Sequence, residues 1–107
     1  MVLVATDLDG TLLRSDGTLS ERSRAALHAV AAAGITTVLV SARGPNGVGL
    51  VADESELSGK AICSNGAIVL DLDTRQILRV RELETAVATE LVRGLRERFP
   101  EIGRAHV

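Results

Sequence analysis

The sequence predicts an α/β fold built on a doubly wound, parallel sheet, and three observations support this class. Segments with strand character alternate with segments with helix character along the 107 residues. Residues 2–5 and 35–41 are almost continuously apolar and rich in β-branched side chains, which is typical of strands covered on both faces. The stretch between them carries apolar residues at helical spacing. The opening unit is therefore strand, helix, strand.

The first helix is expected to begin near residue 20 and to end at Gly34. Thr18 and Ser20 offer capping oxygens, Glu21 suits a first helical turn, and Gly34 can adopt the left-handed conformation that stops a helix. One buried stripe is predicted for this helix from the spacing of Ala26, Leu27, Val30 and Ala31.

The rest of the chain continues the alternation of strands and helices. A weaker helix is expected at 48–57, a short strand at 61–63, two short strands around a turn at 71–75, a helix at 83–99 and the start of another strand at 104–107. The apolar side of the last helix is predicted to consist of Leu83, Val87, Leu91 and Leu95.

The composition indicates a soluble globular protein with a small partner. Apolar residues make up 46%, charged residues 24%, and the net charge is −2, so no basic field would attract nucleic acid or an anionic membrane. The chain has one Phe and no Trp or Tyr, so it has almost no aromatic side chains on which the bases of a single-stranded nucleic acid could stack. Cys63 is the sole cysteine, so it is expected as a small buried hydrophobe. With no basic leader or long apolar segment at the amino terminus, a cytoplasmic location is expected.

Paired carboxylates stand at the end of the first predicted strand. Asp7 and Asp9 lie two residues apart, followed by Gly10, which lets the backbone turn and expose its amides. Ser41 ends the second strand, and a right-handed crossover would place it on the same rim of the sheet as Asp7. The sequence therefore predicts one site that contains both acids and this hydroxyl.

The chemistry that suits these groups is phosphoryl transfer with a hard cation. Carboxylate and carbonyl oxygens suit Mg²⁺, which needs only one or two protein carboxylates and would offset the repulsion between Asp7 and Asp9. One carboxylate can attack phosphorus while the other moves a proton. The Ser41 hydroxyl and the amides near Gly10 would hold the transferred oxyanion.

Three segments, "DLDGTLL", "VLVSARG" and "ICSNGAIVLD", in this order, resemble the haloacid dehalogenase (HAD) superfamily, specifically the Cof-type phosphatases with a large cap inserted after the third core strand. The resemblance implies a Rossmann-like, HAD-type parallel sheet core. Residues 1–72 would form the first half of that core, and residues 73–107 the hairpin or linker and the beginning of an α/β cap domain.

The resemblance also implies a role for each motif residue. Asp7 would be the nucleophile that becomes an aspartyl phosphate, Asp9 the general acid and base, and the two together the Mg²⁺ ligands, Asp9 through its carbonyl. Phosphate contacts are expected from Gly10, Thr11, Ser41 and Ala42, and substrate contacts from Arg43, Asn65 and Gly66. The family often has Thr-Gly-Arg where this chain has Ser-Ala-Arg, so the hydroxyl and the arginine are kept and the glycine is lost.

Two later family elements have no counterpart here, a phosphate-binding lysine and an acidic motif that completes the magnesium site. Lys60 lies ahead of the third strand, in the wrong place. The chain is therefore expected to be the amino-terminal portion of a longer phosphatase of a small phosphorylated metabolite, with little or no activity alone. Its incomplete sheet would expose an edge that invites self-association.

Two other functions compete with this interpretation. "GVGLVA", with Gly47 and Gly49, matches the dinucleotide fingerprint G-x-G-x-x-A, and Asp71 follows about twenty residues on, although residues 41–46 intervene after the strand. A non-catalytic Mg²⁺ or phosphate module, such as a phosphorelay receiver, would place its acceptor Asp at a later strand end, where this chain has Ser41 and Ser64.

Overall fold

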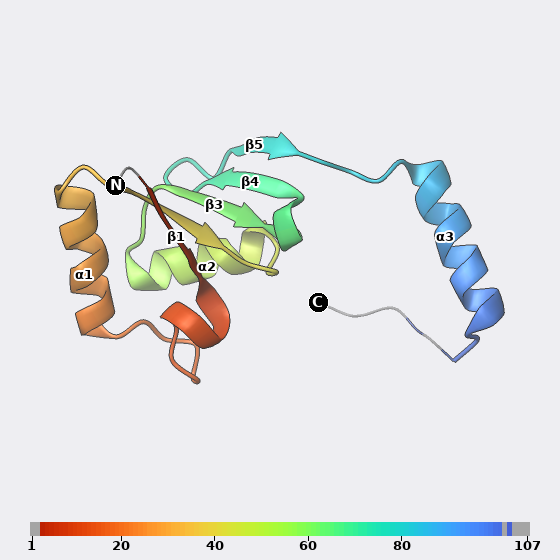
Figure 1. The fold of residues 1–107 in the computed structure, drawn as a ribbon, viewed down its shortest axis with the longest axis horizontal. Helices are drawn as coiled ribbons and strands as arrows, with labels where there is room; N and C mark the ends of the chain where they lie inside the picture. Colours follow the sequence, from red (N-terminus) through yellow and green to blue (C-terminus); the bar gives the residue numbers. More distant parts are fainter. Residues whose placement is uncertain (1–2, 102, 104–107) are drawn as a thin grey trace.

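The protein forms a five-stranded mixed sheet with helices beside it (Figure 1). The computed structural model describes residues 3–101 and 103. The strands lie in the order of the chain and are β1 (Leu3–Asp7), β2 (Thr36–Val40), β3 (Lys60–Cys63), β4 (Ile68–Asp71) and β5 (Ile77–Val80). The first three strands run parallel, and β4 and β5 continue antiparallel. The predicted α/β class is confirmed.

The change from parallel to antiparallel strands follows from the lengths of the connections. Helices connect β1 to β2 and β2 to β3, and such crossovers allow parallel pairing. Residues 72–76 connect β4 to β5, which is long enough only for a turn. The predicted pair of short strands around a turn is therefore present as a hairpin.

The three helices are α1 (Glu21–Ala32), α2 (Pro45–Ser55) and α3 (Thr85–Arg98). The Ser20 hydroxyl accepts a hydrogen bond from the Ser23 N–H at 3.1 Å, so the predicted cap of α1 is confirmed. Thr18 instead belongs to the preceding turn, where its hydroxyl donates to Asp16. Gly34 has a φ of 77°, the left-handed value expected of a helix stop.

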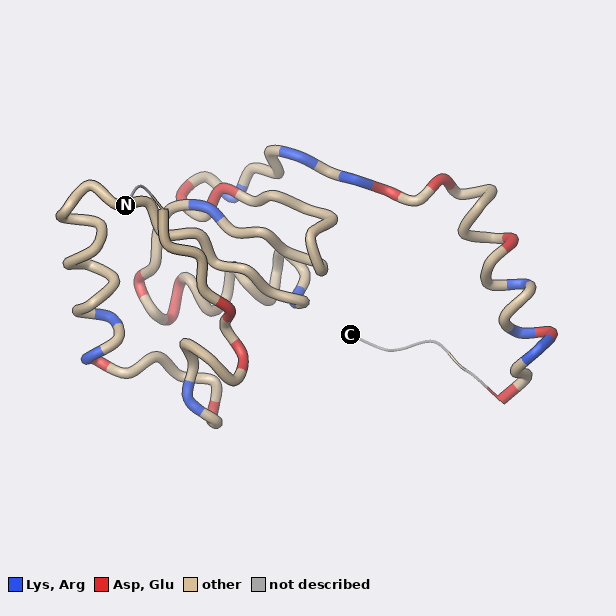
Figure 2. Tube along the Cα trace, in the orientation of Figure 1, with Lys and Arg blue, Asp and Glu red and all other residues tan. Residues whose placement is uncertain are grey.

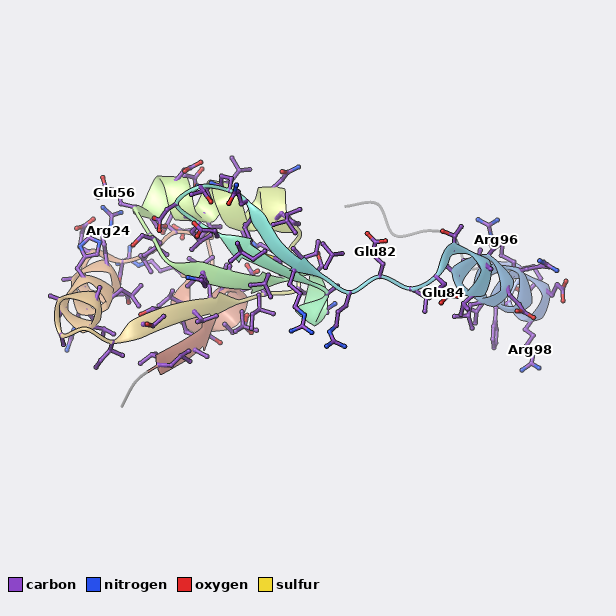
Figure 3. The ribbon with its side chains drawn as sticks, turned by 90° about the horizontal axis from the view of Figure 1, so that it is seen from above. Arg24, Glu56, Glu82, Glu84, Arg96 and Arg98 are labelled. Atoms are coloured by element: carbon purple, nitrogen blue, oxygen red, sulfur yellow. The ribbon has the colours of Figure 1, made fainter. Side chains whose placement is uncertain are left out.

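The core lies between α2 and the sheet. Val48, Val51 and Ala52 of α2 are buried, and Figure 1 shows this helix lying along the strands. They share one apolar cluster with residues from the strands and loops, namely Leu8, Leu13, Leu19, Leu39, Ala61, Cys63, Leu70 and Leu72. Cys63 is fully buried, as expected, and burial raises the pKa of its thiol. Arg24 of α1 forms an ion pair with Glu56 at the end of α2, at 3.6 Å (Figure 3).

Helix α3 stands apart from the sheet at the end of an extended segment (Figures 1 and 3). Val87, Leu91 and Leu95 form its predicted apolar stripe and are each more than 40% exposed. Leu83, which was also predicted for this stripe, precedes the helix, because the helix begins at Thr85 and not at residue 83. Basic and acidic residues are both present along this helix, while the strands carry few charges (Figure 2). The stripe therefore buries nothing within the part of the chain that the structure describes.

Three findings concern the remaining sequence expectations. The buried stripe predicted for α1 is wrong, because no residue of this helix is buried and only Leu27 and Val30 of the four predicted residues are even half-buried. The strand expected at 104–107 lies outside the described residues. Among residues 3–101 and 103, no helix combines the length and the apolar character needed to cross a membrane.

Candidate active site

Asp7 and Ser41 lie on the same edge of the sheet, where β1 and β2 end. The parallel register pairs Asp7 with Val40, the residue directly before Ser41. An open hollow of about 470 Å³ lies at this edge, and its lining consists of Ala5, Thr6, Asp7, Asp9, Val40, Ser41, Ala42 and Asn65. The predicted convergence of both acids and the serine is confirmed, because parallel strands with a crossover end at one rim.

The turn after β1 presents both acids to the hollow. Leu8–Leu12 form one wide helical turn, in which the Leu13 N–H donates to the Leu8 carbonyl at 3.0 Å. Leu8 is fully buried, whereas the acids on either side of it line the hollow. Gly10 has a φ of 75°, which other residues rarely adopt, so a glycine is needed where the turn departs from helical geometry.

The Asp7 carboxylate is held by its own turn. Its Oδ1 accepts a hydrogen bond from the Leu8 N–H at 2.7 Å, and the Asp7 carbonyl accepts one from the Thr6 hydroxyl at 3.0 Å. These contacts hold Asp7 in place at the end of β1, beside the hollow.

Asp9 forms a bidentate ion pair with Arg43. The Arg43 Nε–H donates to Oδ2 at 2.8 Å, and an Nη2–H donates to Oδ1 at 2.6 Å. The hydrogen bonds from Arg43 lower the pKa of Asp9 below its ordinary value, and the same contact raises the pKa of Arg43. Arg43 was predicted to contact the substrate, and its pair with Asp9 was not predicted. The position of Arg43, two residues after Ser41, does place it at the same rim of the sheet.

The loops after β2 and β3 are tied together beside the hollow. Ser41 is buried, its Oγ accepts a hydrogen bond from the Arg43 N–H at 3.0 Å, and its carbonyl accepts one from the Asn65 N–H at 3.3 Å. The Arg43 carbonyl accepts a hydrogen bond from the Ser64 N–H at 2.9 Å. These bonds bring Asn65, predicted from the sequence, to the lining.

Three consecutive residues after β3 have left-handed backbone. Ser64, Asn65 and Gly66 have φ values of 51°, 55° and 97°. Glycine adopts such angles freely and Asn tolerates them, but for Ser they are unfavourable. Strain of this kind concentrates at functional sites, where the surrounding hydrogen bonds hold it in place.

Four predicted contact residues lie beside the hollow rather than in its lining. Gly10 and Thr11 continue the turn after Asp9, and Gly66 follows Asn65. Arg43 touches the site through Asp9. Ala42, in contrast, belongs to the lining. The roles that the resemblance implies for all these residues stay predictions.

The donor atoms at the hollow suit a hard cation. Asp7 and Asp9 line the hollow and offer carboxylate and carbonyl oxygens. Mg²⁺ prefers oxygen ligands and usually binds only one or two protein carboxylates. Both Asp9 carboxylate oxygens face Arg43. The ligands that the family resemblance implies, the Asp7 carboxylate and the Asp9 carbonyl, stay a prediction. Within the described part of the chain, no cluster of three or more His, Cys, Asp or Glu side chains could hold a metal by itself.

The competing glycine fingerprint does not form a phosphate-binding turn. Gly47 and Gly49 lie inside α2 rather than between a strand and a helix. Gly49 is buried, and a Cβ there would lie 3.2 Å from the Arg75 guanidinium, so this glycine makes room for a side chain. The Asp71 carboxylate accepts hydrogen bonds within its own turn. The geometry expected of a dinucleotide site is therefore absent from these residues.

Comparison with known proteins identifies relatives of this chain. A family model for haloacid dehalogenase-like hydrolases matches residues 4–103. The Bacillus subtilis protein named "Putative phosphatase YxeH" is 38% identical over 79 residues, which are 71% of this chain and 29% of that protein.

Solved structures show the same fold. A haloacid dehalogenase-like hydrolase from B. subtilis superposes with a TM-score of 0.82 at 26% identity, covering 92% of this chain and 34% of that one. One from Bacteroides thetaiotaomicron gives a TM-score of 0.72 at 29% identity, covering 90% of this chain and 37% of that one. With the acids of "DLDGT" and Ser41 at one hollow and the family model matched almost from end to end, the chain belongs to the haloacid dehalogenase-like hydrolases.

Proposed function

We propose that the complete protein is a Mg²⁺-dependent phosphatase that hydrolyses a phosphomonoester of a small metabolite through an aspartyl phosphate on Asp7. The observation that carries this proposal is the convergence of Asp7, Asp9 and Ser41 on one hollow. The chain spans 29% of the length of its curated relative, so the activity proposed is that of the whole protein.

The residues of the hollow divide the reaction between them. The Asp7 carboxylate attacks phosphorus and the bond from phosphorus to the ester oxygen breaks. Asp9, once it has taken a proton from solvent, gives that proton to the ester oxygen. Asp9 then takes a proton from the water that hydrolyses the aspartyl phosphate. The Ser41 hydroxyl, which accepts a hydrogen bond from the Arg43 N–H, has its own hydrogen left to donate to a phosphoryl oxygen.

A magnesium ion would be held by the Asp7 carboxylate and the Asp9 carbonyl. Bound there, it would offset the negative charge of the acids and of the phosphoryl group. The described residues offer two acids at the hollow, and further ligands would come from the longer protein or from water.

The proposed substrate is small and carries a phosphate ester. The net charge is −2, and acidic and basic residues are interspersed along the described part of the chain in Figure 2, which does not favour a nucleic acid as the substrate. The identity of the metabolite depends on the parts of the family fold outside this chain.

The test uses the protein encoded by the complete reading frame that contains these residues. Phosphate release from an aryl phosphate should require Mg²⁺ and fall to background in Asp7→Asn. The matched control is Asp53→Asn, which removes a carboxylate of α2 that pairs with Arg75 away from the hollow. Full activity in Asp7→Asn would refute the nucleophile, and phosphate binding without turnover would favour a non-catalytic module.

A further inference from the structure

The Arg43–Asp9 pair lies at the hollow and uses the arginine expected to bind substrate. We propose that Arg43 is a positioning residue, which holds the Asp9 carboxylate in the ligand-free site and transfers its guanidinium to the phosphate group of an arriving ligand. This inference rests on the proposed function and goes beyond it, because it assigns Arg43 two alternating partners.

The backbone of Arg43 is fixed, so an exchange of partners would involve its side chain alone. Its N–H donates to the Ser41 Oγ at 3.0 Å, and its carbonyl accepts from the Ser64 N–H at 2.9 Å. Both bonds tie Arg43 to loops that border the hollow. The stem of the arginine lies beside Gly47 of α2, where a Cβ would be 3.4 Å from the Arg43 Cβ, an ordinary contact distance. The guanidinium can therefore change its position by rotation of the side chain while the backbone of Arg43 stays in place.

The ion pair is exposed enough to be exchanged. The side chains of Arg43 and Asp9 are 35% and 55% exposed, and partly exposed pairs of this kind contribute little net stability. A phosphate dianion carries more charge than a carboxylate and also accepts two parallel hydrogen bonds from a guanidinium. Phosphate is therefore the stronger competitor for Arg43 when it reaches the hollow.

The exchange would make Asp9 available only when a ligand is present. In the structure, each Asp9 carboxylate oxygen accepts a hydrogen bond from Arg43. Once the guanidinium moves to the phosphate, the Asp9 carboxylate is released beside the same phosphate and can face its ester oxygen. Ligand entry and the release of the proton-transfer group become one event.

The chain supplies an internal control, a second pair between Arg75 and Asp53. The side chains of these two residues are 36% and 70% exposed, close to the values for Arg43 and Asp9. Arg75 belongs to the β4–β5 turn and Asp53 to α2, and both border a depression that is separate from the hollow. A ligand that exchanges with Arg43 should leave Arg75 unaffected.

The first experiment follows the arginine Nε–H resonances of the complete protein by NMR, with isotope-labelled arginine, Mg²⁺ and inorganic phosphate as the probe. Without phosphate, the Arg43 resonance should carry the signature of its bond to Asp9, and Asp9→Asn should remove it. Phosphate should shift the Arg43 resonance and leave that of Arg75 in place. An Arg43 resonance that does not respond to saturating phosphate overturns the inference.

The second experiment is a double-mutant cycle on the phosphate dissociation constant. Arg43→Ala should weaken binding roughly tenfold to a hundredfold, as the loss of a charge-assisted pair does, and Arg43→Lys should restore part of it. Asp9→Asn frees Arg43 and should strengthen binding roughly fivefold. This gain should largely vanish in the Arg43→Ala background. An equal gain in both backgrounds would be a general charge effect and would overturn the exchange.

The two proposals fail separately. Neither experiment needs turnover. If Arg43 moves from Asp9 to phosphate in a protein that shows no Asp7-dependent phosphate release, the proposed phosphatase activity is refuted and the proposed exchange of partners still holds. Asp7-dependent release with an Arg43 that never leaves Asp9 would refute the exchange alone.

Discussion

Asp71 closes the turn between β4 and β5 through its carboxylate. Its Oδ1 accepts hydrogen bonds from the N–H groups of Thr74 at 3.0 Å and Asp73 at 2.9 Å, and these bonds, that from Thr74 first, lower the pKa of Asp71. Because the pKa is lower in the folded than in the unfolded protein, the carboxylate stabilises the fold above the unfolded pKa. That contribution is lost as the pH falls through the folded value.

Asp71→Asn keeps an oxygen acceptor without a titrating proton. We expect the urea midpoint of this variant to fall less between neutral and acidic pH than that of the unchanged protein. Asp71→Ala, which removes the acceptor, should be the least stable of the three at neutral pH. Parallel pH profiles for the unchanged protein and Asp71→Asn would contradict this account.

The residues of the site were predictable from the sequence to different degrees. Asp7, Asp9 and Ser41 were predicted to converge because strand ends and crossover handedness follow from apolar periodicity and topology. The Arg43–Asp9 pair was not predicted, since the partner of a charged side chain depends on the path of the loop after β2. That path is set by hydrogen bonds to Ser41 and Ser64 that no pattern of residues reveals.

Helix α3 contains a glycine that costs it stability. Gly94 lies inside Thr85–Arg98, and a Cβ there would meet no atom within 4 Å. Alanine at an interior helical position is favoured over glycine by about 1 kcal/mol. We expect Gly94→Ala to slow amide hydrogen exchange across α3. Gly103→Ala, which follows the helix and is equally unhindered, is the control, and unchanged exchange in Gly94→Ala would contradict the prediction.

Helix α2 shows where prediction of an element was incomplete. The helix was expected from residue 48, but it begins at Pro45, which suits a first helical position. Gly47 and Gly49 lower the helix propensity of this segment, so its first turn was not predicted from the sequence. The helix forms nonetheless because Val48, Val51 and Ala52 pack into the core, and packing of this kind outweighs local preference.

The whole molecule leaves apolar surface uncovered. The stripe of α3 is exposed, and among residues 3–101 and 103 β1 pairs with β2 alone, which leaves its other edge open there. Unpaired edges and apolar patches promote association. We expect sedimentation of this chain to show self-association that grows with concentration and weakens in Leu91→Gln. Glu90→Gln, one residue away, is the control, and a monomer at every concentration would contradict the prediction.

The order of the elements was predictable, but the placement of α3 was not. The alternation of apolar patterns predicted the order of the elements, and three short motifs predicted the family, and both predictions are confirmed. An amphipathic stripe indicates that a helix has a partner without identifying it. The assignment of residues 73–107 to the beginning of a cap therefore stays a prediction.

The left-handed run Ser64–Gly66 ties two properties of the protein together. It carries Asn65 on the wall of the hollow, and it also reverses the chain so that β4 can return along β3. A substitution that relaxed this bend would move a ligand-facing side chain and loosen a hairpin at the same time. Selection for a different side chain arrangement at this part of the hollow would therefore also act on the stability of the β3–β4 pair.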